Sequence, residues 1–431
     1  MFKRIILLFP LMVFLLIREI YANLFRINKD YLTALLLSGL AVLAVVSFQA
    51  RMREKRRDFL VLDIINLLQF VCAAVVITLF YLSGGINDSQ AVYSVYSYCF
   101  APFLIYAAFL VYRLKPVTQR VALIALGCAY ALTVLVAVCE SLGIDYWLFH
   151  YERWILQANY LDIFRASGLY GTHIDYGLLS FLAFTVAFYS RPAKGRWFAS
   201  VVMVLAVLAA LLTMSRAWVG AIGLVVLVHT MMAQSFKRKV QIGVLVLVVG
   251  AGFYTIADQL GFVTMLEAAD VYTQDSNQAR VEFLQQTPKW LREYMIVGTG
   301  PGTQNGPDPG EHTKFVGDFL WLSTMVECGT LFGGALNLAR IVLIALVLWR
   351  TARSDRHGGL RAIAIVVALS FLLAAFINGA YAHYINVAIF YVICGLALVA
   401  EPGQIAADRR STEPAANNPI TGARTSLATS G

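Results

Sequence analysis

The sequence predicts an all-α membrane protein of about twelve transmembrane helices, and three observations support this. Hydrophobic residues make up 59% of the 431 residues and charged residues only 14%, against roughly 25% charged residues in a soluble domain. The mean hydropathy is +0.70. The apolar residues also form continuous runs close to the length of about 20 residues that a membrane-spanning helix needs, whereas the strands of a membrane β-barrel alternate apolar and polar residues. Soluble, disordered and disulfide-framework proteins are therefore excluded.

Twelve apolar segments divide the first 400 residues, which we expect to form a single transmembrane domain. The segment at 319–349 is too long for one untilted crossing, so we expect an interfacial helix over its first third and a span that starts near Gly329. Residues 401–431 are rich in Ala, Thr, Ser, Pro and Asn and predict a disordered tail. The expected spans are 5–22, 31–49, 59–82, 96–112, 121–139, 174–190, 197–213, 217–233, 240–256, 319–349, 362–378 and 381–400.

Basic residues predict the orientation of these helices. Twenty Lys and Arg fall on the side that holds residues 51–57 and 237–239, three more lie in the tail on that side, and ten fall on the opposite side. Cytoplasmic loops carry the excess of Lys and Arg, so we expect both termini in the cytoplasm and the loops at 140–173 and 257–318 outside. Residues 3–22 also have features of a signal peptide, but we interpret them as an uncleaved first helix. Cleavage would leave the orientation of the other helices unchanged.

The net charge of +9 follows from the same topology rule, so it predicts no nucleic-acid partner. All six cysteines lie in or beside apolar runs and none forms a CxxC pair. We therefore expect buried, inert thiols in place of a metal site or a disulfide framework. No Asp-x-Asp motif occurs, which argues against a metal-bound nucleotide-sugar donor.

The external loop 257–318 is net acidic, with nine Asp and Glu against four Lys and Arg. Its arginines, Arg280 and Arg292, are therefore not there to satisfy the topology rule, and each needs a partner or a chemical role. Val281, Leu284 and Leu291 recur at helical spacing. This spacing predicts an amphipathic helix that lies on the membrane surface.

A glycine- and proline-rich turn follows this helix. Five glycines, among them Gly298, Gly300 and Gly302, and three prolines fall between residues 298 and 310. The turn is not a dinucleotide fingerprint, because no strand precedes it and no βαβ unit surrounds it. Two interpretations stay open: a connecting loop, or backbone amides held close to an anionic ligand.

Three charged residues lie inside or at the ends of expected spans. Arg216 falls between two adjacent spans at their external end, where a guanidinium at the interface is usually paired or functional, although it could also extend to the lipid headgroups. Asp63 and Arg340 lie nearer the cytoplasmic side, and we expect structural or headgroup-directed roles for them.

Several of these motifs together resemble the shared core of bacterial O-antigen ligases and O-antigen or exopolysaccharide polymerases. In that core an arginine precedes a Gly-x-Gly turn, and a short apolar motif that ends in Glu-x-Gly follows. Here Arg280 stands 18 residues before Gly298, and Glu327-Cys-Gly329 ends the motif that starts at Phe319. Another glycine, Gly333, lies just beyond it.

Two further elements extend the resemblance to roughly residues 160–340. The pair Ser215-Arg216 is similar to the Ser-Arg element of that family. The stretch from Arg165 to Gly171, Arg-Ala-Ser-Gly-Leu-Tyr-Gly, is similar to the loop before its sixth span. Twelve spans with one large external loop also agree with the architecture that the resemblance implies.

The chain departs from the ligase pattern at one position. Ligases typically open the apolar motif with a His-Asn pair, 11 residues before the last glycine of Glu-x-Gly. Asp318 occupies that place, and the histidine of this region, His312, lies six residues earlier. An Asp at this position resembles exopolysaccharide polymerases, which favours a polymerase over a ligase.

The resemblance implies a glycosyltransferase of the bacterial inner membrane that acts at the periplasmic face on a glycan linked to undecaprenyl diphosphate. It implies no cofactor and no metal. A chain-length regulator or a flippase is an implied partner beside the lipid bilayer. Arg216 and Arg280 would clamp the diphosphate, and Asp318 or His312 would act as the base. The candidate substrate-binding residues are Arg165, Arg292, Gly298, Gly300, Gly302 and Glu327.

Two other classes of function stay open. A polysaccharide transporter or flippase would have two similar halves and interrupted helices near the bilayer midplane, and the sequence shows no internal similarity. A structural assembly partner would need no catalytic residues. The unusual polar residues cluster outside the membrane, which favours the enzyme.

Overall fold

We analysed a computed structural model of the full chain. The structure describes residues 29–54, 59–111, 116–142, 155–158, 161–164, 166, 173–189, 196–213, 216–232, 281, 284–303, 320–353, 363, 365–372 and 384–399. The spans expected at 5–22 and 240–256 and the tail at 401–431 lie outside these residues.

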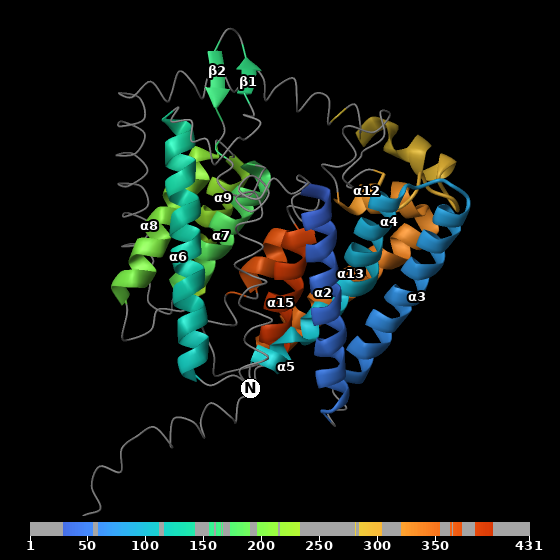
Figure 1. The fold of residues 1–431 in the computed structure, drawn as a ribbon, viewed down its shortest axis with the longest axis horizontal. Helices are drawn as coiled ribbons and strands as arrows, with labels where there is room; N and C mark the ends of the chain where they lie inside the picture. Colours follow the sequence, from blue (N-terminus) through green and yellow to red (C-terminus); the bar gives the residue numbers. More distant parts are fainter. Residues whose placement is uncertain are drawn as a thin grey trace, which may run out of the picture.

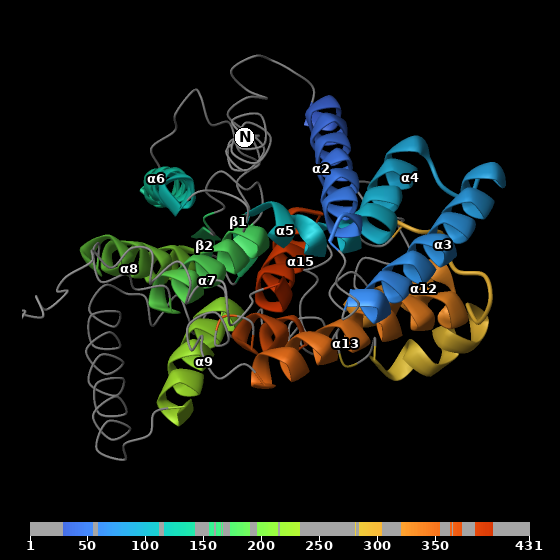
Figure 2. The same ribbon diagram turned by 90° about the horizontal axis from the view of Figure 1, so that it is seen from below.

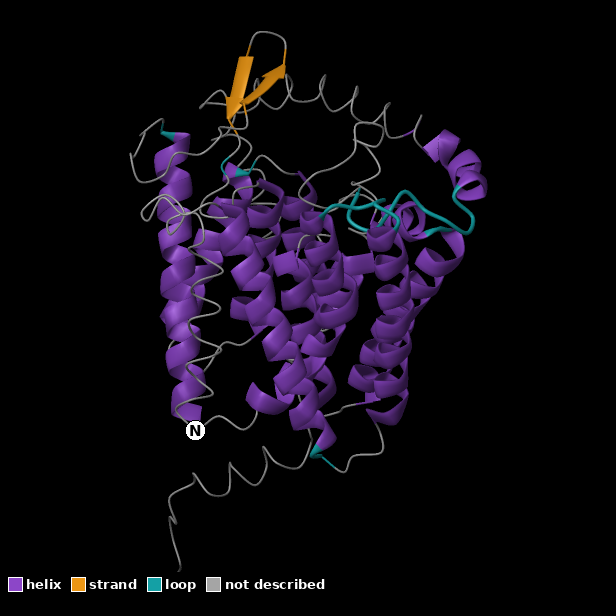
Figure 3. Ribbon diagram, turned by 45° about the vertical axis from the view of Figure 1, so that its right-hand side comes forward, coloured by secondary structure: helices purple, strands orange, loops and turns teal. Residues whose placement is uncertain are grey.

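The described chain is a bundle of helices that run roughly side by side (Figures 1 and 3). Four helical stretches are long and apolar enough to cross a membrane: Thr33–Met52, Leu60–Leu82, Asp88–Val111 and Thr330–Trp349. Large apolar side chains such as Leu68, Leu79 and Leu338 point out of the bundle, as expected where lipid replaces water. The all-α class is confirmed, and a polytopic membrane protein is plausible. The number of twelve spans stays a prediction.

Most described helices coincide with expected spans. They are α2 (Lys29–Met52), α3 (Leu60–Leu82), α6 (Pro116–Ser141), α7 (His173–Tyr189), α8 (Arg196–Leu212), α9 (Arg216–Met232) and α15 (Tyr384–Val399). Viewed from below (Figure 2), α6 to α9 form one group, and α2, α3 and α13 (Thr330–Arg353) form another, with α15 between them.

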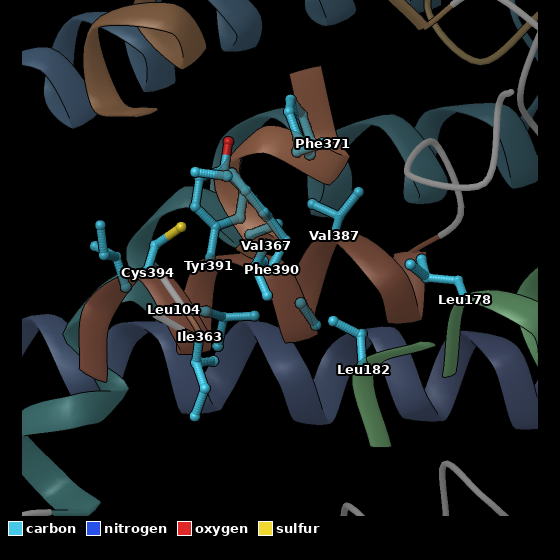
Figure 4. Close-up of a cluster of buried hydrophobic side chains, with 14 of the residues drawn as sticks. Leu104, Leu178, Leu182, Ile363, Val367, Phe371, Val387, Phe390, Tyr391 and Cys394 are labelled. Atoms are coloured by element: carbon cyan, nitrogen blue, oxygen red, sulfur yellow. The ribbon is translucent and has the colours of Figure 1, made fainter. Parts of the chain in front are cut away.

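Helix α15 lies at the centre of the core (Figure 4). The rings of Phe371 and Phe390 stack with centroids 4.1 Å apart. A Cβ at Gly395 would overlap the carbonyl of Ile105, so a glycine here lets the backbones of two helical segments touch. Val367, Phe390 and Cys394 are all buried in the same cluster.

The expected span 96–112 starts eight residues earlier than predicted and is not a uniform α-helix. It consists of α4 (Asp88–Ser94), the π-helix η2 (Val95–Phe100), the 3₁₀-helix η3 (Ala101–Tyr106) and α5 (Ala107–Val111). Asn87 and Gln90 form a capping box that fixes the start. Most of this stretch is buried inside the protein, which is where irregular backbone is tolerated at membrane depth.

The expected segment 319–349 divides at Gly329, which has a φ of 83°, as predicted. Seven of the nine residues of its first part, α12 (Leu320–Cys328), are buried within the protein, and its expected position at the membrane interface stays a prediction. It folds back along α13: a Cβ at Gly333 would overlap the Thr324 carbonyl, and Asn337 Nδ2 donates to the Trp321 carbonyl at 2.7 Å. A small residue and one amide thus pack α12 against α13, a contact that the hydropathy pattern did not indicate.

A β-hairpin in the loop 140–173 was not predicted. Strands β1 (Ile155–Ala158) and β2 (Leu161–Phe164) pair antiparallel, with Ile155 opposite Phe164 and Ala158 opposite Leu161. The hairpin stands at the end of the bundle opposite to the connection between α2 and α3 (Figure 3).

Candidate functional site

The turn at residues 298–303 lies at the same end of the bundle as the hairpin and is fixed to the end of α12. The amide of Thr299 donates to the Val326 carbonyl at 2.9 Å, and the amide of Gly300 donates to the Glu327 carbonyl at 3.0 Å. A Cβ at Gly298 would overlap the Glu327 carbonyl. The turn thus satisfies carbonyls at the C-terminus of α12 that the helix itself leaves without partners.

The other two predicted glycines of this turn have left-handed backbone conformations. Gly300 has a φ of 115° and packs on Ile86, and Gly302 has a φ of 83° and packs on Gln90 and Ser94 of α4. Glycine adopts these angles without the steric penalty of other residues. The glycines therefore join the turn to α4 as well as to α12, and the anion-binding interpretation of the turn stays a prediction.

The expected surface helix is present over residues 284–293. Trp290, Leu291 and Tyr294 pack on Leu322 and Val326 of α12, while Val281 and Leu284 are exposed. Arg292 is exposed on this helix. The helix therefore has one apolar side against α12, but of the three residues predicted to share its apolar face only Leu291 packs there. Its position on the membrane surface stays a prediction.

Glu327 is completely buried, and its Oε2 accepts a hydrogen bond from the Tyr98 hydroxyl at 2.6 Å. The Arg340 guanidinium lies over the Tyr98 ring, 5.5 Å from its centroid, and donates to Thr324 Oγ1 at 3.1 Å. Arg340 is only 4% exposed. It therefore has a structural role, as expected, and does not extend to the lipid headgroups.

A related network lies towards the other end of the bundle around Asp63. Arg51 Nη2 forms an ion pair with Asp63 Oδ2 at 2.8 Å, and the Tyr106 hydroxyl donates to Asp63 Oδ1 at 2.6 Å. Asn66 Nδ2 donates to the Tyr106 hydroxyl at 3.2 Å. These contacts support a structural role for Asp63, one of the two roles expected for it.

One buried polar pair was missed in the sequence. Asn386 of α15 donates from Nδ2 to Asp175 Oδ1 of α7 at 2.6 Å, and both side chains are buried. Asp175 stands at the start of an expected span. A charged residue at such a position usually needs a partner, so the sequence could have indicated it. Its partner lies 211 residues away, beyond the reach of any local pattern.

Most of the predicted catalytic residues, and the predicted substrate-binding residue Arg165, lie outside the described residues. Arg165, Arg280, His312 and Asp318 are not among the described residues. Arg216 is the first residue of α9, and its side chain is outside the description. The amide of Ala166 donates to the Leu212 carbonyl at 3.0 Å, so the chain next to Arg165 meets the end of α8, four positions before Arg216.

The two halves of the predicted arginine clamp start from different parts of the bundle. Helix α9 lies with α7 and α8, whereas the helix at 284–293, just after Arg280, lies beside α12 (Figures 1 and 2). Whether Arg216 and Arg280 meet stays a prediction. Among the described residues, no group of three His, Cys, Asp or Glu side chains could hold a metal ion.

Comparison with known proteins identifies one family. Residues 201–318 match the model of the family described as O-antigen ligase. The match starts within α8, includes α9 and the turn at 298–303, and ends two residues before α12. A search of curated proteins found no match to the chain.

Proposed function

We propose that this chain, which carries an O-antigen ligase domain over residues 201–318, polymerises oligosaccharide repeat units linked to undecaprenyl diphosphate at the periplasmic face of the inner membrane. The family domain is the observation that carries the proposal, because that family acts on lipid-linked polysaccharide. The apolar helices support it, since a lipid-linked donor is presented in a bilayer.

The diphosphate leaving group sets the first chemical requirement. Negative charge develops on it as the glycosidic bond to the lipid breaks, and arginines in a low-dielectric site stabilise such charge. Arg216 and Arg280 fill this role in the proposal. Lys would replace them poorly, because a guanidinium binds phosphate oxygens in a bidentate geometry. Arg165 and Arg292 would bind further parts of the substrate.

The acceptor hydroxyl sets the second requirement, a base that accepts its proton. Asp318 is the proposed base, because it stands where ligases have their histidine and directly before the buried helix α12. An aspartate next to arginines stays ionised at neutral pH, so it positions the hydroxyl as much as it removes the proton. No metal takes part in this mechanism, because the arginines supply the positive charge.

A ligase that transfers the glycan to the lipid A core is the second candidate. The description of the matched family as O-antigen ligase favours it, and His312 offers it a base. In a ligase the acceptor is the core sugar of lipid A, whereas in a polymerase the acceptor is a second lipid-linked glycan.

The choice of acceptor separates the two functions. Purified protein in lipid nanodiscs would receive the lipid-linked repeat unit either alone or together with lipid A core. A ladder of lipid-linked products from the repeat unit alone is the expected result. A product that forms only with lipid A core would assign the ligase, and no product with either acceptor would reject glycosyl transfer.

A further inference from the structure

We infer that Tyr98, Glu327 and Arg340 are positioning residues for the proposed glycosyl transfer, on which this inference rests. They hold α12 and the turn at 298–303 as one unit against the irregular helical stretch from α4 to α5 (Asp88–Val111). Glu327 therefore acts through other residues and does not contact substrate itself, which revises its expected role in substrate binding.

Helix α13 holds α12 through two polar residues one turn apart. Asn337 binds the Trp321 carbonyl at 2.7 Å, and Arg340 binds Thr324 Oγ1 at 3.1 Å. Arg340 also lies 3.4 Å from Asn337 Oδ1, which aligns both donors on the same face of α12. These bonds fix how far α12 lies along α13.

Tyr98 connects this pair of helices to a third element. It belongs to the π-helix η2, whose extra residue per turn redirects side chains and is frequent at functional sites. Its hydroxyl donates to the Glu327 carboxylate, and the Arg340 guanidinium lies over its ring. One phenol thus touches both an anion and a cation that are buried within the bundle.

The unit formed by α12 and the turn borders the proposed catalytic loop on both sides. This loop connects Thr303, the last residue of the turn, to Leu320, the first residue of α12. The turn before it is bonded to the carbonyls of Val326 and Glu327, and the helix after it is α12 itself. A shift of α12 would therefore move both ends of the loop together, and a displacement of about 1 Å can lower a rate about 10²-fold.

The burial of Glu327 argues against a direct catalytic role. Its side chain is completely enclosed, and its carboxylate is oriented by Tyr98. Glu327 and Arg340 are opposite charges buried against the same residue, Tyr98, and the loss of one buried charge costs more than the loss of both, because the other then lacks a compensating charge nearby. A positioning role of Glu327 therefore predicts that a double variant lacking both charges is more active than the single variant, whereas a role of Glu327 as acid or base predicts that both are inactive.

The experiment compares Tyr98→Phe with the matched control Tyr106→Phe. Each change removes one hydroxyl that donates to a carboxylate at 2.6 Å. Glu327 is completely buried, whereas Asp63, the partner of Tyr106, is partly exposed and lies away from α12. We expect Tyr98→Phe to lower kcat per folded molecule about 10-fold or more with an unchanged KM for the lipid-linked donor. Tyr106→Phe should leave both constants near those of the wild type. Equal effects of the two changes, or no effect of Tyr98→Phe, would overturn the inference.

A pair of charge variants tests the role of Glu327 in the same assay. Glu327→Gln alone should lose activity, and Glu327→Gln combined with Arg340→Met should recover kcat to within about 10-fold of the wild type, since neither charge is then left unpaired. A double variant as inactive as Glu327→Gln, yet folded, would indicate a direct catalytic role and contradict the inference.

Hydrogen exchange gives a readout that does not depend on activity. Amides of residues 320–328 should exchange faster in Tyr98→Phe than in the wild type or in Tyr106→Phe. If the wild type transfers no glycan, the proposed function fails, whereas this exchange still shows whether Tyr98 holds α12. Unchanged exchange in Tyr98→Phe would refute the positioning itself.

Discussion

The Tyr98 hydroxyl donates a 2.6 Å hydrogen bond to Glu327, although 229 positions separate the two residues in the sequence. Tyr106, eight residues further along the same helical stretch, makes a bond of the same length to Asp63. Both carboxylate networks include an arginine, Arg340 in one and Arg51 in the other. Only the network at Glu327 contacts the elements that border the proposed catalytic loop.

The close approach of the turn to α12 predicts a large effect of Gly298→Ala. The added Cβ would overlap the Glu327 carbonyl, and overpacking of this kind typically costs about 1–3 kcal/mol. We expect a lower melting temperature in detergent and reduced transfer activity. Gly334→Ala is the matched control, because nothing lies within 4 Å of a Cβ at Gly334. Equal melting temperatures for the two variants would show that the turn is not packed as described.

The buried pair of Asp175 and Asn386 predicts a second stability effect. Asn386→Leu removes a 2.6 Å hydrogen bond to the Asp175 carboxylate, and a hydrogen bond to a charged group contributes about 1.5–3 kcal/mol. Asp175→Asn in the Asn386→Leu background should restore part of the loss, because the remaining group is then neutral. Thermal unfolding of both variants measures this, and a double variant less stable than Asn386→Leu would contradict it.

The proposed arginine clamp predicts loss of activity without loss of the fold. Arg216→Ala and Arg280→Ala should each lower the rate about 10²–10³-fold, the usual effect of removing one stabiliser of developing charge. Arg→Lys at either position should recover little of it. Arg353→Ala, at the end of α13 away from the turn, serves as the control. A rate for Arg280→Ala within threefold of the control would remove Arg280 from the clamp.

The mechanism predicts that no divalent metal is required. In the proposed mechanism the arginines neutralise the negative charge of the diphosphate, so a chelator added to the purified protein with its lipid-linked donor should leave turnover unchanged. Turnover that is lost with chelator and restored by magnesium or manganese would show that a metal supplies the charge.

The boundaries of the helices could be predicted where apolar runs are simple. Helices α2 and α3 follow directly from their hydropathy, because nothing else in those segments competes with membrane insertion. The start of the stretch at Asp88 was missed, because a polar capping box around Asn87 precedes the apolar run. The hairpin at 155–164 was missed because its two short strands lack a clear alternation of apolar and polar residues.

The candidate site depends more on contacts that no local pattern contains. The motif from Arg280 to Gly333 could be recognised from its resemblance to the O-antigen ligase and polymerase family. The three glycines of the turn have left-handed conformations or close contacts. The burial of α12 and the partners of Glu327, Arg340 and Asp175 come from segments that meet only in the folded bundle. Hydropathy gives the length of a segment but not the neighbours of its charged residues.

The polymerase and the ligase hypotheses assign the base to different residues, Asp318 and His312. They therefore predict different effects of substitutions at these two positions. Asp318→Asn should shorten or abolish the product ladder, whereas His312→Ala should retain it, because the base of the proposed polymerase is the aspartate. Gel analysis of glycan length with the lipid-linked repeat unit measures this. A normal ladder from Asp318→Asn beside an inactive His312→Ala that blocks transfer to lipid A core would favour the ligase.

The most direct test of the central claim is the stoichiometry of the wild-type reaction. Purified protein in nanodiscs receives a single synthetic repeat unit on undecaprenyl diphosphate, and mass spectrometry follows both products over time. The proposed polymerase should release one undecaprenyl diphosphate for each new glycosidic bond and produce lipid-linked dimers, trimers and longer chains. Intact donor after prolonged incubation, or its movement across the bilayer without any new glycosidic bond, would contradict glycosyl transfer by this protein.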